Sequence, residues 1–87
     1  MPDDSLIEYP CHFPIKVMGL HVEQFHAAIV EAVLRHAPDF DITTVECRPS
    51  REGRYLSLTC TVNATSREQL DNLYRELSAH PLVKLVL

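Results

Sequence analysis

The chain has 87 residues, of which 46% are hydrophobic and 23% charged, and its formal net charge is −4. This length and composition predict one globular domain with one modest core rather than a disordered chain. The acidic balance argues against nucleic acid as a partner, because nucleic-acid-binding proteins carry a basic surface that displaces counterions from phosphates.

The N-terminal segment predicts neither export nor a membrane anchor. The first ten residues, MPDDSLIEYP, are acidic and lack the basic and apolar regions of a signal peptide. No apolar run approaches the roughly 20 residues that a membrane span needs. We therefore expect a cytoplasmic protein with no membrane partner, in which the three cysteines are reduced thiols.

The first half of the chain predicts a tail, a strand and a helix. Residues 1–11 are polar and proline-marked and predict a loose N-terminal tail before a single domain over residues 12–87. Apolar and polar side chains alternate over residues 13–18, which indicates a strand, and Gly19 is expected to end it. A helix over residues 22–37 follows. Its predicted buried stripe consists of Val22, Phe25, Ile29, Val33 and His36.

A hairpin is predicted next. Residues 42–48 and 54–62 have the alternation of two antiparallel strands, joined by a turn at 49–53. On the second strand, four side chains are expected to face inward: Leu56, Leu58, Cys60 and Val62. Cys47 on the first strand is also expected to face inward, so two of the cysteines are interpreted as small buried hydrophobes.

The last segment predicts a helix and a strand. Thr65 and Ser66 are both suited to cap a helix, because Glu68 and Gln69 follow three residues after each. The predicted buried stripe of this helix consists of Leu70, Leu73, Tyr74 and Leu77. A short strand over residues 82–87 completes the order βαββαβ. Each helix has one apolar stripe and crossovers are right-handed, so we expect an α+β ferredoxin-like fold, a four-stranded antiparallel sheet with both helices on one face.

The cysteines and histidines form no recognisable metal or catalytic motif. Zinc sites commonly use CxxC or HxxxH-type spacing, and neither occurs among Cys11, Cys47, Cys60 and the five histidines. His26 and His36 share the first predicted helix, but they lie about 15 Å apart along its axis. No Ser/His/Asp set, paired carboxylates or glycine-rich phosphate loop stands out. We expect no metal, no cofactor and no catalytic residue, and the role of Cys11 stays open.

One position is suited to bind an anion. Gly19 and His21 lie where the first strand gives way to a helix N-terminus, whose free backbone N–H groups can hold an anion. The simpler interpretation is that Gly19 permits a tight turn and that His21 is solvated.

The outward face of the sheet is expected to carry Lys16, Met18, Tyr55, Thr59, Lys84 and Val86. These residues are mixed polar and apolar, which suits a moderate interface or plain solvent. They lack the aromatic platform with which RNA-binding domains of this topology stack bases. The outward face therefore predicts no nucleic-acid partner.

Four segments together resemble the small bacterial YbeD-like family: FPIKVMG (13–19), RHAP (35–38), LTCTVNAT (58–65) and VKLVL (83–87). The resemblance spans nearly the whole chain, with the segments in order. It implies a ferredoxin-like fold without established catalytic activity. The family is similar to ACT-type regulatory domains, which bind small amino acids in metabolic enzymes, and it is sometimes labelled a lipoate regulatory protein.

ACT-type domains often bind their ligand after the first strand, commonly across a dimer interface. In this chain the resemblance maps ligand binding onto Met18, Gly19, Leu20 and His21. The acidic residue and the proline common before the loop glycine of those domains are lacking here. The resemblance implies a non-enzymatic regulatory or binding module, acting on a protein partner or a small carboxylate, and a homodimer. The alternatives are an anion-binding enzyme that uses this loop and a protein-interaction module with no small ligand.

Overall fold

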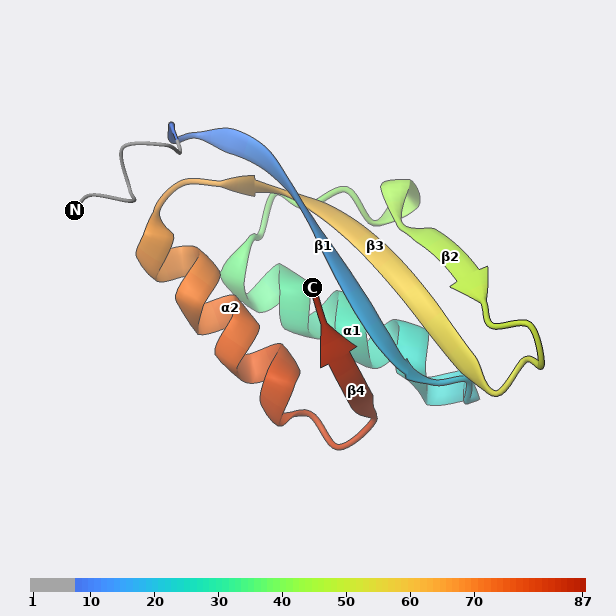
Figure 1. Cartoon of the computed structure of the whole chain (residues 1–87). Coiled ribbons are helices and arrows are strands. Elements are labelled where there is room, and N and C mark those ends of the chain that lie inside the picture. Colours follow the sequence, from blue (N-terminus) through green and yellow to red (C-terminus); the bar gives the residue numbers. More distant parts are fainter. Residues whose placement is uncertain (1–7) are drawn as a thin grey trace.

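The computed structural model describes residues 8–87, and two long strands form its centre (Figure 1). β1 (Cys11–Leu20) and β3 (Tyr55–Ala64) have ten residues each and pair antiparallel along their whole length. Successive side chains of a strand point to opposite faces, so every second residue faces the core. The four β3 residues predicted to face inward are all buried, with exposed fractions of 8% or less: Leu56, Leu58, Cys60 and Val62.

Most of the predicted tail, residues 1–7, lies outside the described residues. β1 begins at Cys11, one residue before the predicted start of the domain. Tyr9, just ahead of this strand, packs against the buried core.

Two short strands flank the central pair. β2 (Glu46–Pro49) pairs with β3 and β4 (Val83–Val86) pairs with β1, both antiparallel, so the sheet order is β2-β3-β1-β4. β4 meets β1 only over Val17–Gly19, beside which Lys16 and Leu87 exchange backbone hydrogen bonds of 3.0 and 2.8 Å. The central pair therefore extends beyond both edge strands.

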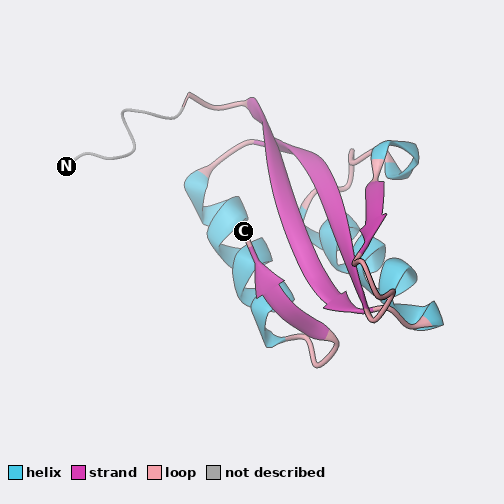
Figure 2. Cartoon of the chain, turned by 45° about the vertical axis from the view of Figure 1, so that its right-hand side comes forward, coloured by secondary structure: helices cyan, strands magenta, loops and turns pink. Residues whose placement is uncertain are grey.

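Both helices lie on one face of the sheet (Figure 2), which confirms the predicted ferredoxin-like fold. α1 (Glu23–His36) begins and ends one residue inside its predicted range, 22–37, and α2 (Arg67–Ala79) begins directly after Ser66, one of its two predicted caps. Their buried residues are Phe25, Ile29, Ala32, Val33, Leu70, Leu73 and Leu77. Within residues 8–87, neither helix is long and apolar enough to span a bilayer.

Two residues of the stripe predicted for the first helix are not part of its buried face. Val22 is the residue just before α1 and is 40% exposed, because the chain there is still extended. His36 lies in the last turn and is half-buried, with its ring directed to the second helix. Ala32 takes the remaining place against the sheet.

Gly19 does not end the first strand as predicted. It lies inside β1, paired with Leu56 on one side and Val83 on the other, and the register towards β4 shifts directly before it. A Cβ atom at this position would lie 2.3 Å from the Leu82 carbonyl oxygen and 2.4 Å from Phe25 Cε1. The glycine is required because the chain entering β4 and an aromatic ring of α1 both close onto the strand here.

The strand predicted from residue 42 onward is also wrong in its first half. Ile42–Thr44 form one turn of 3₁₀ helix, because the carboxylate of Asp41 accepts hydrogen bonds from the Thr43 backbone N–H (3.0 Å) and hydroxyl (2.6 Å). Such local side-chain bonds compete with the pairing of a strand. As a result β2 has only four residues.

Cys47 is exposed, contrary to the prediction that it is buried. It pairs with Leu58, whose side chain lies in the core, so the predicted face is right. However, β2 is an edge strand, and all four of its residues are exposed. Alternation identifies the face of a residue but not whether a helix reaches far enough to cover it.

The two helices are tied together at two points. Ser66 caps α2 by accepting the Gln69 N–H (3.1 Å), and the Gln69 side chain accepts the Thr65 N–H (2.7 Å) and donates to the His36 carbonyl (2.8 Å). Two turns further along, Glu76 accepts hydrogen bonds from α1. Both predicted cap residues thus take part, and the cap also closes the C-terminal end of the first helix.

Candidate binding face on the open side of the sheet

Within residues 8–87, no element covers the sheet face opposite the helices (Figure 1). Two rows of side chains cross this face, because residues paired on neighbouring strands point the same way. The first row, from β4 to β2, is Leu87, Lys16, Thr59 and Glu46. The second row is Leu85, Met18, Ser57 and Arg48. We call these eight residues the open face.

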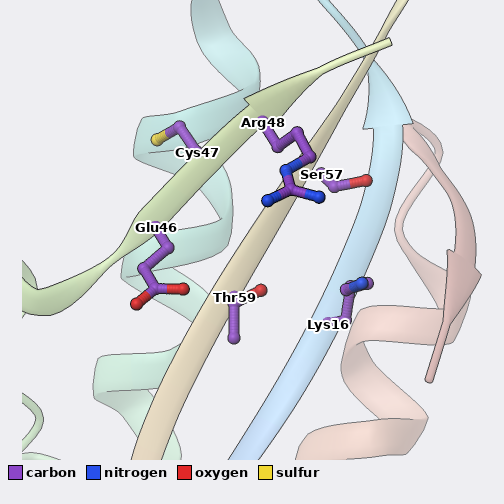
Figure 3. Close-up of a pocket in the computed structure, with 6 residues that line it drawn as sticks. All are labelled: Lys16, Glu46, Cys47, Arg48, Ser57 and Thr59. Atoms are coloured by element: carbon purple, nitrogen blue, oxygen red, sulfur yellow. The ribbon is translucent and has the colours of Figure 1, made fainter.

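The β2 side of the open face is polar and hollowed. Figure 3 shows the guanidinium of Arg48 directed over β3, towards Ser57 and Thr59, while the Cys47 sulfur points away from the other labelled side chains. The hollow has a volume of about 220 Å³. It is lined by Lys16, Glu46, Cys47, Arg48, Ser57 and Thr59.

Two cations on this face have no counter-ion. Among residues 8–87, the side chains of Lys16 and Arg48 make no ion pair or hydrogen bond, and both residues are exposed. Glu46 in the same hollow is also unpaired within that range. Guanidinium, ammonium and hydroxyl groups all donate hydrogen bonds to carboxylate or phosphate oxygens. The hollow is therefore suited to hold an anionic group, on a chain whose overall net charge is −4.

The β4 side of the open face is apolar. Leu85 and Leu87 are 44% and 64% exposed, and Met18 lies half-buried beside them. The prediction that Val86 faces outward is wrong: it pairs with Val17 and packs against the core, and Leu85 takes the outward position. Alternation counted along β4 cannot place its register on β1, because the pairing is irregular there.

The four residues predicted to bind a ligand lie in different surroundings. Met18 belongs to the open face, whereas Gly19 is buried against α1 and the chain before β4. Leu20 is the last residue of β1, and His21 is exposed in the two-residue connection to α1. The structure therefore does not gather them around one concave site.

The backbone N–H groups beside Gly19 are already engaged. The Leu20 N–H donates to the Leu82 carbonyl (3.1 Å), the His21 N–H to the Arg54 carbonyl (3.0 Å), and the Val22 N–H to the Leu20 carbonyl (2.9 Å). The His21 ring also lies against the β2–β3 loop, with Nδ1 3.0 Å from the Gly53 carbonyl oxygen. These contacts engage the N–H groups of the connection itself, and ligand binding at this point stays a prediction.

Metal-ligating and nucleophilic side chains are dispersed. Among residues 8–87, no three His, Cys, Asp or Glu side chains are grouped so that they could hold a metal ion. Burial, with a smaller contribution from Cys47, raises the pKa of the Cys60 thiol to about 11, so this cysteine is protonated and unreactive at neutral pH. His36 Nε2 lies 2.7 Å from a Glu76 carboxylate oxygen, where it serves helix packing.

The sequence alone did not single out the hollow. Alternation places Glu46, Arg48 and Ser57 on the outward sides of their strands, but it does not place them next to Lys16. The register of three strands does so, with Arg48 opposite Ser57 and Thr59 opposite Lys16. The available signal was the predicted five-residue hairpin loop, because loop length restricts the register of the two strands that it joins.

Comparison with known proteins relates the chain to a protein family and to a solved structure. The model of a family described as "Protein of unknown function (DUF493)" matches residues 4–87. A "UPF0250 protein" of Janthinobacterium sp. (strain Marseille) is 63% identical over 86 residues, which cover 99% of this chain and 94% of that protein. "UPF0250 protein NE1487" of Nitrosomonas europaea is 56% identical over 87 residues, the full length of both chains.

A solved structure has the same fold. The solution structure of protein HP0495 from H. pylori superimposes with a TM-score of 0.69 at 19% sequence identity. The superposition covers 100% of this chain and 94% of that one. At this level of identity the likeness concerns the fold alone.

Proposed function

We propose that this chain, which belongs to the family described as "Protein of unknown function (DUF493)", is a small non-enzymatic module that binds a protein partner through the open face. Membership confirms the resemblance to the YbeD-like family that four sequence segments predicted. The proposal places the protein in the cytoplasm, as its sequence led us to expect. The names of the relatives state no activity, and support for the proposal comes from the open face itself.

One observation carries the proposal: two unpaired cations lie beside three exposed or half-buried apolar side chains on a sheet face that the described chain leaves uncovered. An interface needs apolar area to exclude water and placed charges to select a partner. The open face combines both, from Leu85, Leu87 and Met18 on one side to Lys16 and Arg48 on the other.

The size of the hollow supports a protein partner over a small ligand. Small-molecule sites usually enclose roughly 300 to 1,000 Å³ and bury most of their ligand. The hollow measures about 220 Å³ and opens along the sheet surface. It is suited to receive one or two side chains of a partner. The ACT-like and lipoate roles that the resemblance implies stay predictions.

The proposal is tested by position-specific cross-linking in living bacteria. A photoreactive amino acid replaces Ser57, at the centre of the open face, or Glu68, which is exposed on α2 on the other side of the molecule. We expect a discrete protein adduct from position 57 and none from position 68. Adducts from both positions, or from neither, would contradict binding through the open face.

A further inference from the structure

We infer that the segment bound on the open face is an acidic amphipathic helix of the partner protein, with apolar side chains over Met18, Leu85 and Leu87 and carboxylates over Lys16 and Arg48. This inference rests on the proposed function and gives the chemistry of the partner. It follows from the order of side chains across the sheet, from their position on the face of the sheet, and from the two unpaired cations among them.

The open face changes from apolar to cationic across the strands. The two leucines lie on β4 and directly after it, and the β1 positions are Lys16 and Met18. The β3 positions are hydroxyls, and Arg48 lies on β2 together with Glu46. Neighbouring strands are about 4.8 Å apart, so this change takes place over roughly 15 Å. A partner segment must therefore be apolar on one side and negatively charged on the other.

The side chains that would contact the partner lie on the face of the sheet and not at its edge, which favours a bound helix over a bound strand. An added strand pairs with backbone groups at a sheet edge. At these two rows the edges of the sheet are β4 and β2, so an added strand would lie beside the sheet and not over Lys16 and Met18. A helix is about 10 Å wide with its side chains and thus covers two strands at once. Laid over β1 and β3, it would bring one flank to the leucines and the other to Arg48.

Charge complementarity favours carboxylates as the partner's polar flank. Lys16 and Arg48 are exposed and unpaired within residues 8–87, and Arg48 can form a bidentate pair with a carboxylate. Glu46 lies at the far end of the first row, where it would repel a carboxylate placed over β2. It thereby restricts the acidic groups to the Lys16–Arg48 diagonal, which is how like charges contribute to specificity.

A nucleic acid fits the same face less well. Its regularly spaced phosphates would extend past Lys16 and Arg48 onto a chain with a net charge of −4, whereas a helix needs carboxylates only over these two cations. Its bases would meet methionine and leucine at the two rows. Within residues 8–87 the stacking side chains that β1–β4 direct to this side are Tyr55 and His12, which lie outside both rows.

The test uses the full chain and two designed helical peptides of about 18 residues, long enough to span the sheet. The peptides share one leucine stripe and carry either glutamate or lysine along one flank. Binding is followed by fluorescence anisotropy of a dye on the peptide. We expect the acidic peptide to bind and the basic peptide to bind at least about tenfold more weakly.

Charge reversal supplies the decisive comparison. In the double variant Lys16→Glu/Arg48→Glu the preference should reverse, with the acidic peptide losing at least about tenfold in affinity and the basic peptide gaining. The matched control, Arg51→Glu/Arg75→Glu, makes the same change of net charge in the hairpin loop and on α2 and should keep the original preference. If the double variant does not fold, Arg48→Glu alone is tested in its place, because all residues of β2 are exposed and the change leaves the core intact.

Leu85→Ser tests the apolar half and should weaken both peptides by a similar factor. Equal affinity of the acidic peptide for the double variant and for the control would overturn the inference. So would tighter binding of a single-stranded RNA of the same charge. If either result came with a cross-link at position 57, the open face would remain the binding surface and only the acidic helix would fail. If position 57 gave no adduct, the proposed function itself would fail.

Discussion

Gly19 shows how one residue can decide the packing of three elements. The chain leading into β4 passes its Cα atom so closely that a Cβ would lie 2.3 Å from the Leu82 carbonyl oxygen. The Phe25 ring of α1 closes the same space from the helix side. Backbone cannot move as a side chain can, so a methyl group here must push the strand away from its neighbour.

Gly19→Ala is expected to destabilise the protein by about 1–3 kcal/mol, the usual cost of overpacking a filled core. Urea unfolding followed by circular dichroism measures the loss. Gly53→Asn is the matched control, because nothing lies within 4 Å of a Cβ at Gly53 and asparagine tolerates its φ of 76°. An alanine at position 19 that unfolds at the same urea concentration as the unmodified chain would contradict this packing.

Between elements, Gln69 holds the start of α2 and the end of α1 with one side chain. Its oxygen accepts the Thr65 N–H and its nitrogen donates to the His36 carbonyl. A glutamate at this position of a capping box is usually favourable. Here it would lose the donor and place a negative charge beside the negative end of the α1 dipole.

Gln69→Glu is therefore expected to lower the free energy of unfolding by about 1 kcal/mol, comparable to the loss of the cap itself in Ser66→Ala. Equilibrium urea unfolding of both variants gives the comparison, with Glu68→Gln in the same turn as the control. A Gln69→Glu variant as stable as the unmodified chain would show that the bond to His36 contributes nothing.

Glu76 makes the contact between the helices depend on pH. Arg35 donates to one of its oxygens and His36 lies 2.7 Å from the other, and the hydrogen bond from Arg35, followed by that from His36, lowers the pKa of the carboxyl below its usual 4.5. A carboxyl with a lowered pKa in the folded state stabilises the protein fully above the pKa of the unfolded state. This stabilisation is lost as the pH falls through the folded-state pKa.

The Tm difference between the unmodified chain and Glu76→Gln should accordingly be largest near neutral pH and shrink below about pH 4.5. Thermal unfolding between about pH 7 and about pH 3 tests this. Glu31→Gln serves as the control, because Glu31 pairs with the same arginine at 3.3 Å but is 75% exposed. A Tm difference that stays constant through the acid range would exclude Glu76 as the titrating contact.

Across the whole molecule, stability should be highest in the β1–β3 pair and lowest at β2. The backbone N–H of Lys16 points to Leu87 on the β4 side. The N–H groups of Ile15 and Val17, one residue before and one after, therefore point to β3, in the middle of the sheet. The N–H of Arg48 lies in an edge strand that is exposed throughout. Opening free energy falls where few buried contacts hold an element.

Amide hydrogen exchange followed by NMR should thus show Ile15 and Val17 exchanging only on global unfolding. The Arg48 amide should exchange at least about tenfold faster, which corresponds to about 1.4 kcal/mol in opening free energy. Equal rates at the three amides would mean that the sheet opens as one unit.

The fold follows from patterns within short segments, and the open face does not. Alternation in β3 and the stripe of α2 are local patterns. The first predicted every buried residue of β3 except Ala64, which lies past the predicted end of the strand. The second predicted the three buried leucines of α2, although Tyr74 of the same stripe is only half-buried. Before β2 the alternation did not produce a strand, because the Asp41 side chain bonds to Thr43, two residues further along the chain. The pairing of Arg48 with Ser57 and the outward position of Leu85 depend on registers between separate strands, and one of these is irregular.

The length of the central pair has a consequence for the behaviour of the protein in a crowded solution. β4 does not reach the first residues of β1, so this part of β1 has no partner strand on that side. Such an unpaired edge can bind strands of other molecules and start an aggregate. Pro14 lies on this stretch, on the same edge as the Lys16 backbone groups that bond to Leu87. Because proline has no N–H to donate, an incoming strand finds one bond fewer at this position. Pro14 thus opposes aggregation through the unpaired edge that the length of β1 creates.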